Sequence, residues 1–302
     1  MAEDDTLLDS MITAACKAGL NSLDVLEGTF RVERKSDRSP VTRADTEADA
    51  IISRTLAACG LPIVSEESPL PDHEQRMSWP RYFLVDPLDG TKGFVRGGQE
   101  FAVNIALMHE QTPVLGVIAL PISGTLYFGG PEVATCHVDE GFETVLMHPH
   151  SIFFRAHPAG HDATETRESG QPERSDRLRV IASRHSLDEA TGNWIAGLKT
   201  QLAGNTNSSP PFIETVQAGS AAKFCALAES EADVYPRFAP CMEWDTAAGV
   251  ALLRGAGGEV YDAGTGAPLA YGDPDWYSRP FIAVSRAGFA KGMGVGGIAE
   301  ER

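Results

Sequence analysis

Two short apolar runs in the first third of the chain each lead into a pair of acidic residues. The run LPIVS is followed by Glu66 and Glu67, and the run RYFLV is followed by Asp86 and Asp89. Apolar runs of this length predict buried strands, so the four carboxylates would lie together at the strand ends. Such a group would repel itself and raise its own pKa values unless a cation were bound. The pattern therefore predicts a cation site.

The ligand types at this site predict which cation it takes. Carboxylate oxygens with no neighbouring His or Cys suit Mg²⁺ or Mn²⁺ rather than Zn²⁺. Pro87 stiffens the turn, and the Leu88 carbonyl is a further candidate ligand. An acidic surface turn is the alternative interpretation.

Composition limits the partners of the chain. The 302 residues are 42% hydrophobic and 22% charged, as in globular proteins. The formal net charge is -17 and the pI is about 4.8, so we expect no broad basic surface for polymeric nucleic acid or anionic lipid. A small anionic substrate remains compatible, because a few local cations or bound metal ions can outweigh distant negative charge.

The amino terminus, MAEDDTLL, is acidic where a signal peptide is basic, and no apolar run reaches the ~18 residues of a membrane-spanning helix. We therefore expect a cytoplasmic protein without a transmembrane segment. Its five cysteines are odd in number and lack paired metal-ligand spacing, which favours buried reduced thiols.

The first half is predicted to be α+β. Apolar spacing predicts amphipathic helices over 5–25 and up to Cys59, where Gly60 would end the second. Short apolar runs bounded by turn residues predict strands, several of them antiparallel, at 61–65, 81–85, 101–108, 113–121 and 125–130.

The second half is predicted to be α/β. The stretch 155–177 has no apolar periodicity and is rich in charge, Pro and Gly, so it is a predicted loop or linker. After it, predicted strands and helices alternate. This divides the chain into a metal-binding half at 1–154, the linker, and a half at 178–302 that completes the metal site and the substrate pocket.

Three further segments carry candidate site residues. Asp245 stands at a predicted helix start, where the small residues after it would let the helix approach another backbone and bring Asp245 to the carboxylates of the first half. Helix capping is the alternative for Asp245. The amides of Gly90 and Thr91 could bind a phosphate oxygen, although Asp-Gly is also an ordinary turn. Thr42 and Asp45 stand at the start of the second helix, and helix capping alone could explain one of them.

The motifs VTRAD, VSEES, VDPLDGT and WDTAAG together resemble the signature of the Mg²⁺-dependent, lithium-sensitive phosphatase superfamily that includes inositol monophosphatases and bisphosphate nucleotidases. Within it, LVDPLDGTKGF, FAVNIAL, GSAAKFCALAES and YPRFAPCMEWDTAAG most resemble the bacterial 3'(2'),5'-bisphosphate nucleotidases. The resemblance implies a layered αβαβα sandwich with its active site between the two halves.

The resemblance also implies two or three Mg²⁺ ions, for which Mn²⁺ could substitute. The ligands it implies are Glu66, Asp86 and the Leu88 carbonyl for one ion, and Asp86, Asp89 and Asp245 for a second. Glu67 would help to hold a third, weaker ion or its waters. Asp45 and Thr91 match the pair that orients and deprotonates the attacking water.

Substrate contacts follow from the same resemblance. Gly90 and Thr91 would hold the phosphate that is cleaved. Lys223 and Arg237, with Ser220 beside them, match positions that meet a second, 5'-phosphate, while Ser183 and His185 would contact ribose or base. The usual GSS of the family is Gly219, Ser220 and Ala221 here, which removes one hydroxyl from this region.

The implied reaction is hydrolysis of 3'-phosphoadenosine 5'-phosphate, or of its sulfated parent, to recycle a by-product of sulfate assimilation. An inositol or sugar monophosphatase of the same superfamily is the first alternative, and a nucleotide-binding regulator without catalysis is the second. A homodimer, and association with the inner face of the cell membrane, are left open.

Overall fold

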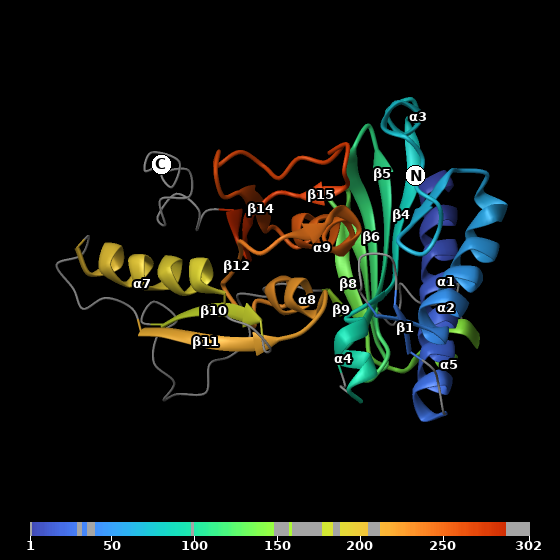
Figure 1. Ribbon diagram of the computed structural model, residues 1–302, viewed down its shortest axis with the longest axis horizontal. Helices are drawn as coiled ribbons and strands as arrows, with labels where there is room; N and C mark the ends of the chain where they lie inside the picture. Colours follow the sequence, from blue (N-terminus) through green and yellow to red (C-terminus); the bar gives the residue numbers. More distant parts are fainter. Residues whose placement is uncertain are drawn as a thin grey trace.

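The fold is a stack of five layers in which helices and sheets alternate (Figure 1). The computed structural model describes residues 2–28, 32–34, 40–97, 100–147, 157–158, 177–183, 188–204 and 212–287. The layers are an outer helix pair, a seven-stranded sheet, an inner helix pair, a five-stranded sheet and one outer helix. This order confirms the predicted αβαβα sandwich.

The outer helix pair consists of α1 (Ala2–Glu27) and α2 (Arg43–Leu56). Both helices bury an apolar face against the first sheet, as their periodicity predicts. A one-turn 3-10 helix, η1 (Ala57–Cys59), extends α2 and ends at Gly60, whose φ of 70° is the left-handed conformation that glycine adopts most easily. Both sequence-predicted helices are confirmed.

The seven-stranded sheet has the order β3-β4-β5-β6-β7-β8-β9. Strand β3 runs parallel to β4, and the other neighbours are antiparallel. The strands are β3 (Ile63–Ser65), β4 (Arg81–Asp89), β5 (Ala102–His109), β6 (Thr112–Leu120), β7 (Thr125–Gly130), β8 (Val133–Val138) and β9 (His157–Pro158). The first five match the predicted strands, whereas β8 and β9 were not predicted.

Side-chain alternation along β4 aims one carboxylate at the middle of the molecule. Phe83 and Val85 join the core beneath α1 and α2, whereas Tyr82 and Leu84 join the core on the opposite face of the sheet. Because successive strand residues point to opposite faces, Asp86 continues the series of Tyr82 and Leu84. The strand therefore presents Asp86 toward the inner helices.

Short elements lie between these longer helices and strands. Strands β1 (Val32–Arg34) and β2 (Pro40–Thr42) pair antiparallel just before α2. Three short helices lie between strands of the first sheet in the chain: α3 (His73–Met77), α4 (Thr91–Val95) and α5 (Phe142–Met147).

The inner helix pair consists of α8 (Ala222–Ala228) and α9 (Ala247–Gly255), and the 3-10 helix η4 (Glu243–Asp245) precedes α9. Helix α9 lies so close to β6 that a Cβ atom on Gly116 would be 2.3 Å from the Ala248 carbonyl oxygen. The predicted close approach at the small residues after Asp245 is confirmed. Asp245 itself ends η4, and Thr246 occupies the cap position of α9. The expectation that Asp245 caps the helix was therefore wrong by one residue.

The five-stranded sheet has the order β11-β10-β12-β16-β14. Strand β10 is parallel to β11 and β12, whereas β16 runs antiparallel to β12 and β14. The strands are β10 (Arg177–Ser183), β11 (Phe212–Ala218), β12 (Val234–Arg237), β14 (Glu259–Asp262) and β16 (Phe281–Val284). Helix α7 (Glu189–Gly204) covers its outer face, and β13 (Cys241–Met242) pairs with β15 (Tyr277–Ser278) nearby. The buried strand β16 was not predicted.

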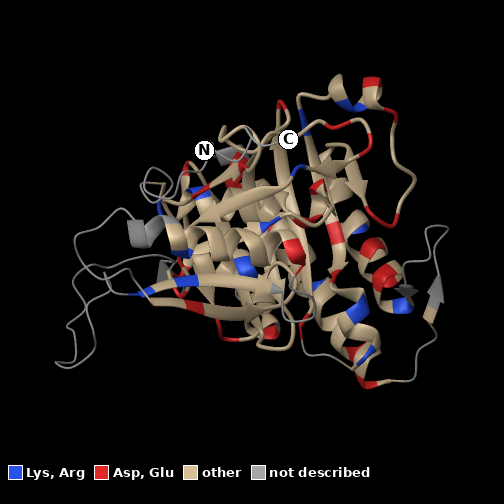
Figure 2. Ribbon diagram, turned by 60° about the vertical axis from the view of Figure 1, so that its left-hand side comes forward, with Lys and Arg blue, Asp and Glu red and all other residues tan. Residues whose placement is uncertain are grey.

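The predicted linker at 155–177 lies outside the described residues except for His157–Pro158, which adds β9 to the first sheet, and for Arg177. No helix in the described ranges combines the length and the apolar character that a bilayer crossing needs. Lys and Arg are scattered singly among Asp and Glu over the elements seen in Figure 2.

Candidate functional site

A cavity of about 430 Å³ opens where the end of β4 faces the inner helix pair. Its walls come from β4, α4, α8, β12 and η4, so residues from before 155 and from after 177 line the same space. A cavity of roughly 300–1,000 Å³ is the size that takes small-molecule ligands in proteins. The sequence-predicted residues that line it are Glu66, Asp86, Leu88, Asp89, Gly90, Thr91, Ser220, Lys223, Arg237 and Asp245.

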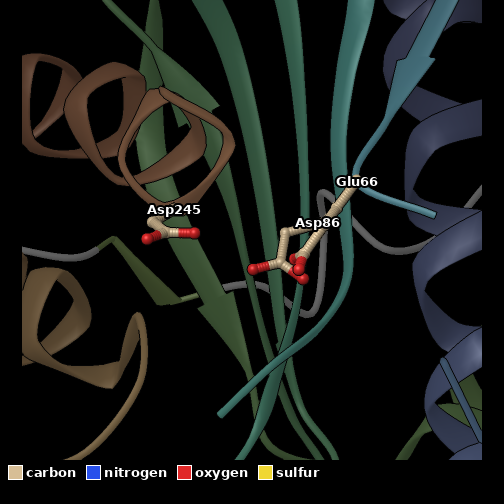
Figure 3. A group of neighbouring side chains, drawn as sticks. All are labelled: Glu66, Asp86 and Asp245. Atoms are coloured by element: carbon tan, nitrogen blue, oxygen red, sulfur yellow. The ribbon is translucent and has the colours of Figure 1, made fainter. Parts of the chain in front are cut away.

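Three carboxylates meet in this cavity. Glu66, Asp86 and Asp245 each offer an oxygen, and these oxygens lie within 4.8 Å of one another. Figure 3 shows the carboxylates of Glu66 and Asp86 converging, with Asp245 facing them from the chain just before α9. The cluster therefore joins a loop after β3, the inner face of β4 and the second half of the chain.

The surroundings make charge on this cluster costly. Burial, followed by the charges of Glu66, Asp89 and Asp245, raises the pKa of Asp86 well above its ordinary value. Burial and the charge of Asp89 raise the pKa of Asp245 to about 7. Crowded carboxylates of this kind are stabilised by a bound cation, and oxygen donors alone suit a hard divalent ion. The residues present thus fit Mg²⁺ or Mn²⁺.

Asp89 lies at the end of β4, beyond an irregularity in its pairing with β5 that separates it from Asp86. At the turn of this irregularity, the Leu88 N–H donates a hydrogen bond of 3.0 Å to Asp86 Oδ1. Burial raises the pKa of Asp89, while the positive charges of Lys223 and Arg237 oppose the rise. Asp89 is not one of the three described carboxylates that meet, but its charge acts on Asp86 and Asp245 and is itself influenced by Lys223 and Arg237.

Asp45 and Thr91 form a hydrogen-bonded pair next to the cluster. The Thr91 hydroxyl donates to Asp45 Oδ1 at 2.9 Å and lies 3.1 Å from the Leu88 carbonyl oxygen. The other oxygen of Asp45 accepts from both the N–H and the hydroxyl of Thr42, at 2.8 and 2.7 Å, in a capping box that begins α2. Asp45 is thus held rigidly by the helix cap, and capping accounts for only one of its two oxygens.

Gly90 allows the chain to turn into α4. Its φ of 99° is unfavourable for residues with a side chain, and a Cβ at this position would lie 2.8 Å from the Glu100 carbonyl oxygen. The glycine is therefore required both by its backbone conformation and by the close approach of the loop before β5.

Lys223 and Arg237 bring positive charge to the cavity from α8 and β12. Lys223 is 6% exposed, its Nζ lies 5.5 Å from the centroid of the Tyr235 ring, and burial lowers its pKa to about 8. Arg237 donates to the Tyr235 hydroxyl at 3.4 Å and to the Pro240 carbonyl at 3.3 Å. Its Nε finds no hydrogen-bond partner within the described chain, so this donor is available to a ligand.

Ser220 also lines the cavity. Its φ is 45°, and its buried hydroxyl has no protein partner in the described ranges. An unpaired buried hydroxyl is costly, and a bound anion would satisfy it.

Some predicted residues lie elsewhere. Glu67 is not among the residues that line the cavity, and its N–H lies 3.4 Å from the Ser65 hydroxyl. His185 and the side chain of Ser183 lie outside the described residues.

Several residues that line the cavity were not predicted from the sequence, among them Tyr235 and Glu100. Tyr235 could have been found from strand periodicity, because it precedes Arg237 by two positions and so shares its face. Glu100 carries no local signal, since its approach to Gly90 and Gly219 depends on the packing of separate segments.

Comparison with known proteins gives consistent results. The sequence model of the Inositol monophosphatase family matches residues 4–288. The 3'(2'),5'-bisphosphate nucleotidase CysQ of Escherichia coli K12 is 34% identical over 284 residues, which are 92% of this chain and 99% of that protein. The protein of the same name from Salmonella typhimurium is 36% identical over 261 residues, covering 85% and 90% of the two chains.

Two solved structures have a similar fold. The crystal structure of CysQ from Bacteroides thetaiotaomicron, described as a bacterial member of the inositol monophosphatase family, superposes with a TM-score of 0.73 at 34% identity and covers 92% of this chain and 96% of that one. An inositol monophosphatase from Anabaena has a TM-score of 0.62 at 20% identity, covering 95% and 94%, and shows the shared fold.

Proposed function

This chain belongs to the inositol monophosphatase family of phosphatases, and we propose that it is a Mg²⁺-dependent 3'(2'),5'-bisphosphate nucleotidase. The proposed reaction converts 3'-phosphoadenosine 5'-phosphate and water to AMP and phosphate. The names of its relatives from Escherichia coli and Salmonella typhimurium support this substrate class.

One observation carries the proposal: a single cavity holds both a carboxylate cluster and the cationic side chains of Lys223 and Arg237. A phosphomonoesterase needs the carboxylate cluster, because phosphoryl transfer depends on positioning and on neutralising phosphate charge. A substrate with a second phosphate would also use the cationic side chains, because an Arg fork and a Lys ammonium pair well with phosphate oxygens. A monophosphate of inositol or of a sugar would leave Lys223 and Arg237 without such a partner.

The proposed metal ligands follow the carboxylates. Glu66, Asp86 and the Leu88 carbonyl would hold one ion, and Asp86, Asp89 and Asp245 would hold a second. When bound, Mg²⁺ supplies charge neutralisation for the phosphate and lowers the pKa of water. The binding of a third ion at Glu67 remains a prediction, and so does the replacement of Mg²⁺ by Mn²⁺.

Asp45 and Thr91 would activate the attacking water. Thr91 lines the cavity and Asp45 does not, so the Thr91 hydroxyl stands between the carboxylate and the water. Its oxygen would accept a proton from the water while its own proton passes to Asp45 Oδ1. The Gly90 and Thr91 amides at the start of α4 would orient the phosphate that is attacked.

The second phosphate would lie against Lys223 and Arg237, within reach of the Ser220 hydroxyl. The unpaired Arg237 Nε and Ser220 Oγ supply donors for it. Ser183 and His185 stay predicted contacts of the ribose or base, and a homodimer stays a prediction.

The test is phosphate release from 3'-phosphoadenosine 5'-phosphate and from inositol 1-phosphate, measured side by side with Mg²⁺, with Mn²⁺ and after addition of Li⁺. We expect a strong preference for the nucleotide and suppression by Li⁺. A preference for inositol 1-phosphate would overturn the substrate and leave a phosphatase of the same fold. Tight nucleotide binding without phosphate release would instead indicate a regulator.

A further inference from the structure

A charged pair that takes no part in the proposed reaction lies fully buried near the acidic cluster. Arg76 on α3 and Glu243 on η4 are 167 positions apart, and both are 0% exposed. The Arg76 Nη2 donates to Glu243 Oε2 in a direct ion pair. Glu243 precedes Asp245 by two positions, so the pair joins the first half of the chain to the turn that carries Asp245.

On the Arg76 side, the guanidinium reaches strand β4. Its Nε lies 3.1 Å from the Tyr82 hydroxyl and 3.2 Å from Gln111 Oε1, and its carbon lies 3.9 Å from the centroid of the Trp276 ring. Tyr82 lies on the same face of β4 as Asp86. Arg76 is therefore anchored to the strand that holds one member of the cluster.

On the Glu243 side, the carboxylate and backbone hold η4 in place. Its Oε1 accepts hydrogen bonds from the N–H groups of Gly272 and Asp273, at 2.8 and 2.9 Å. Its own N–H donates to the Trp276 carbonyl at 2.9 Å, and its carbonyl accepts from the Thr246 hydroxyl at 3.1 Å. Every polar group of Glu243 is thus used, and the turn that ends at Asp245 has little freedom to shift.

A buried ion pair is a poor choice for stability alone, because well-packed apolar residues of similar size are often as stabilising. The directed hydrogen bonds of a guanidinium add something else, because they fix the orientation of the groups that they join. Metal affinity needs that orientation, because ligand oxygens displaced from their positions bind an ion less tightly. The use of a charged pair at this position is explained if it orients a ligand.

We propose that the Arg76–Glu243 ion pair positions Asp245 against Glu66 and Asp86, so that metal affinity depends on two residues that do not touch the metal. The proposal rests on the proposed function only in taking Asp245 as a metal ligand. Arg76 and Glu243 are positioning residues, since the cavity lining includes neither of them.

The decisive variants are Arg76→Lys and Glu243→Gln in the full chain. Lysine keeps the charge, but its single ammonium cannot serve the partners that the planar guanidinium reaches. Glutamine keeps an acceptor for the two N–H groups and loses the charge. For both variants we expect Mn²⁺ binding to the substrate-free protein, followed by electron paramagnetic resonance, to weaken at least 10-fold. The Mg²⁺ concentration for half-maximal turnover should rise by a similar factor, while kcat at saturating Mg²⁺ stays within about 3-fold.

The matched control is Arg179→Lys. Arg179 also forms an ion pair with a carboxylate, Asp233, at 2.9 Å, but both residues belong to the second half and neither lines the cavity. This variant should lower the melting temperature without changing Mn²⁺ affinity.

Two results would overturn the proposal, and they distinguish failure of the positioning role from failure of the metal assignment. If the wild-type chain binds Mn²⁺ and both variants bind it equally well, the ion pair has no positioning role. If the wild-type chain binds no Mn²⁺, the metal assignment fails and the positioning role fails with it. Should Arg76→Lys not fold, Glu243→Gln and the double variant Arg76→Met/Glu243→Gln, which leaves no unpaired buried charge, give the same discrimination.

Discussion

The Thr91 hydroxyl donates a 2.9 Å hydrogen bond to Asp45 Oδ1, across 46 positions of the sequence. This bond joins the start of α4 to the first turn of α2. Thr42 occupies the other oxygen of Asp45, so the carboxylate cannot turn away. The cavity reaches Thr91 and stops short of Asp45, which makes the threonine hydroxyl the only described link between this carboxylate and the cavity.

Thr91→Val should therefore lower kcat at least 100-fold while the fold is retained. Valine has nearly the same shape and lacks the hydroxyl, and a positioned proton acceptor contributes about 10²–10⁴-fold to such reactions. Thr91→Ser keeps the hydroxyl and should stay within about 10-fold of wild type. Steady-state kinetics at saturating Mg²⁺ decide the matter, and equal activity of the Val and Ser variants would contradict the proton relay.

Asp86→Asn should abolish turnover and stabilise the metal-free protein. Asparagine removes one charge from a cluster in which burial and neighbouring carboxylates raise the pKa of Asp86, so the repulsion is relieved. We expect at least a 100-fold loss of kcat, together with a higher melting temperature in chelator. Both are measured on one preparation, by kinetics and by thermal unfolding.

The control for Asp86→Asn is Asp262→Asn. The Asp262 carboxylate accepts the N–H groups of Gly264 and Thr265, both at 2.8 Å, in a turn away from the cavity. Its replacement should leave kcat unchanged and should not raise the melting temperature. A destabilised Asp86→Asn protein would argue against crowding of charge at the cluster.

The stability of the metal-free protein should fall as the pH rises from about 4 to above 7. Burial and Asp89 raise the pKa of Asp245 from 3.8 to about 7, and burial raises the pKa values of Asp86 and Asp89. A group whose folded pKa is raised contributes stability below its unfolded pKa, and this contribution is lost as the pH passes the folded pKa. Thermal unfolding in chelator across this range measures the fall.

Saturating Mg²⁺ should remove most of that dependence, because a bound cation favours the ionised carboxylates. If the metal-free protein were equally stable at pH 5 and pH 8, the cluster would not carry the expected electrostatic cost.

Arg237→Ala should weaken recognition of the 5'-phosphate without affecting the phosphate that is cleaved. We expect the KM for 3'-phosphoadenosine 5'-phosphate to rise at least 30-fold and the KM for a simple monophosphate to change less than 3-fold. The reason is that Arg237 would meet only the 5'-phosphate, where a charge-assisted hydrogen bond contributes strongly. Equal changes for both substrates would place Arg237 at the reacting phosphate or remove it from recognition.

Much of the local structure could be predicted because local patterns encode it. The apolar spacing of α1 and α2 predicts their buried faces, and the runs that became β3 to β7 are short, apolar and bounded by turn residues. Strand β16 is a short apolar run of the same kind between Pro280 and Ser285, and it was nevertheless not predicted. Buried strands of this length are not distinguished by periodicity.

By itself, the sequence determined the chemistry that the site can hold: oxygen ligands without His or Cys, a Thr-Asp helix cap, and a Lys and an Arg in the second half. Only the tertiary structure decided which of these residues meet. It brings Glu66 to Asp86 and Asp245 while Glu67 lies outside the cavity lining, and it seats Arg76 against Glu243. The physical reason is that residue type and periodicity act over a few positions. Contacts between residues about 160 positions apart are set by how five layers pack and by which faces they bury.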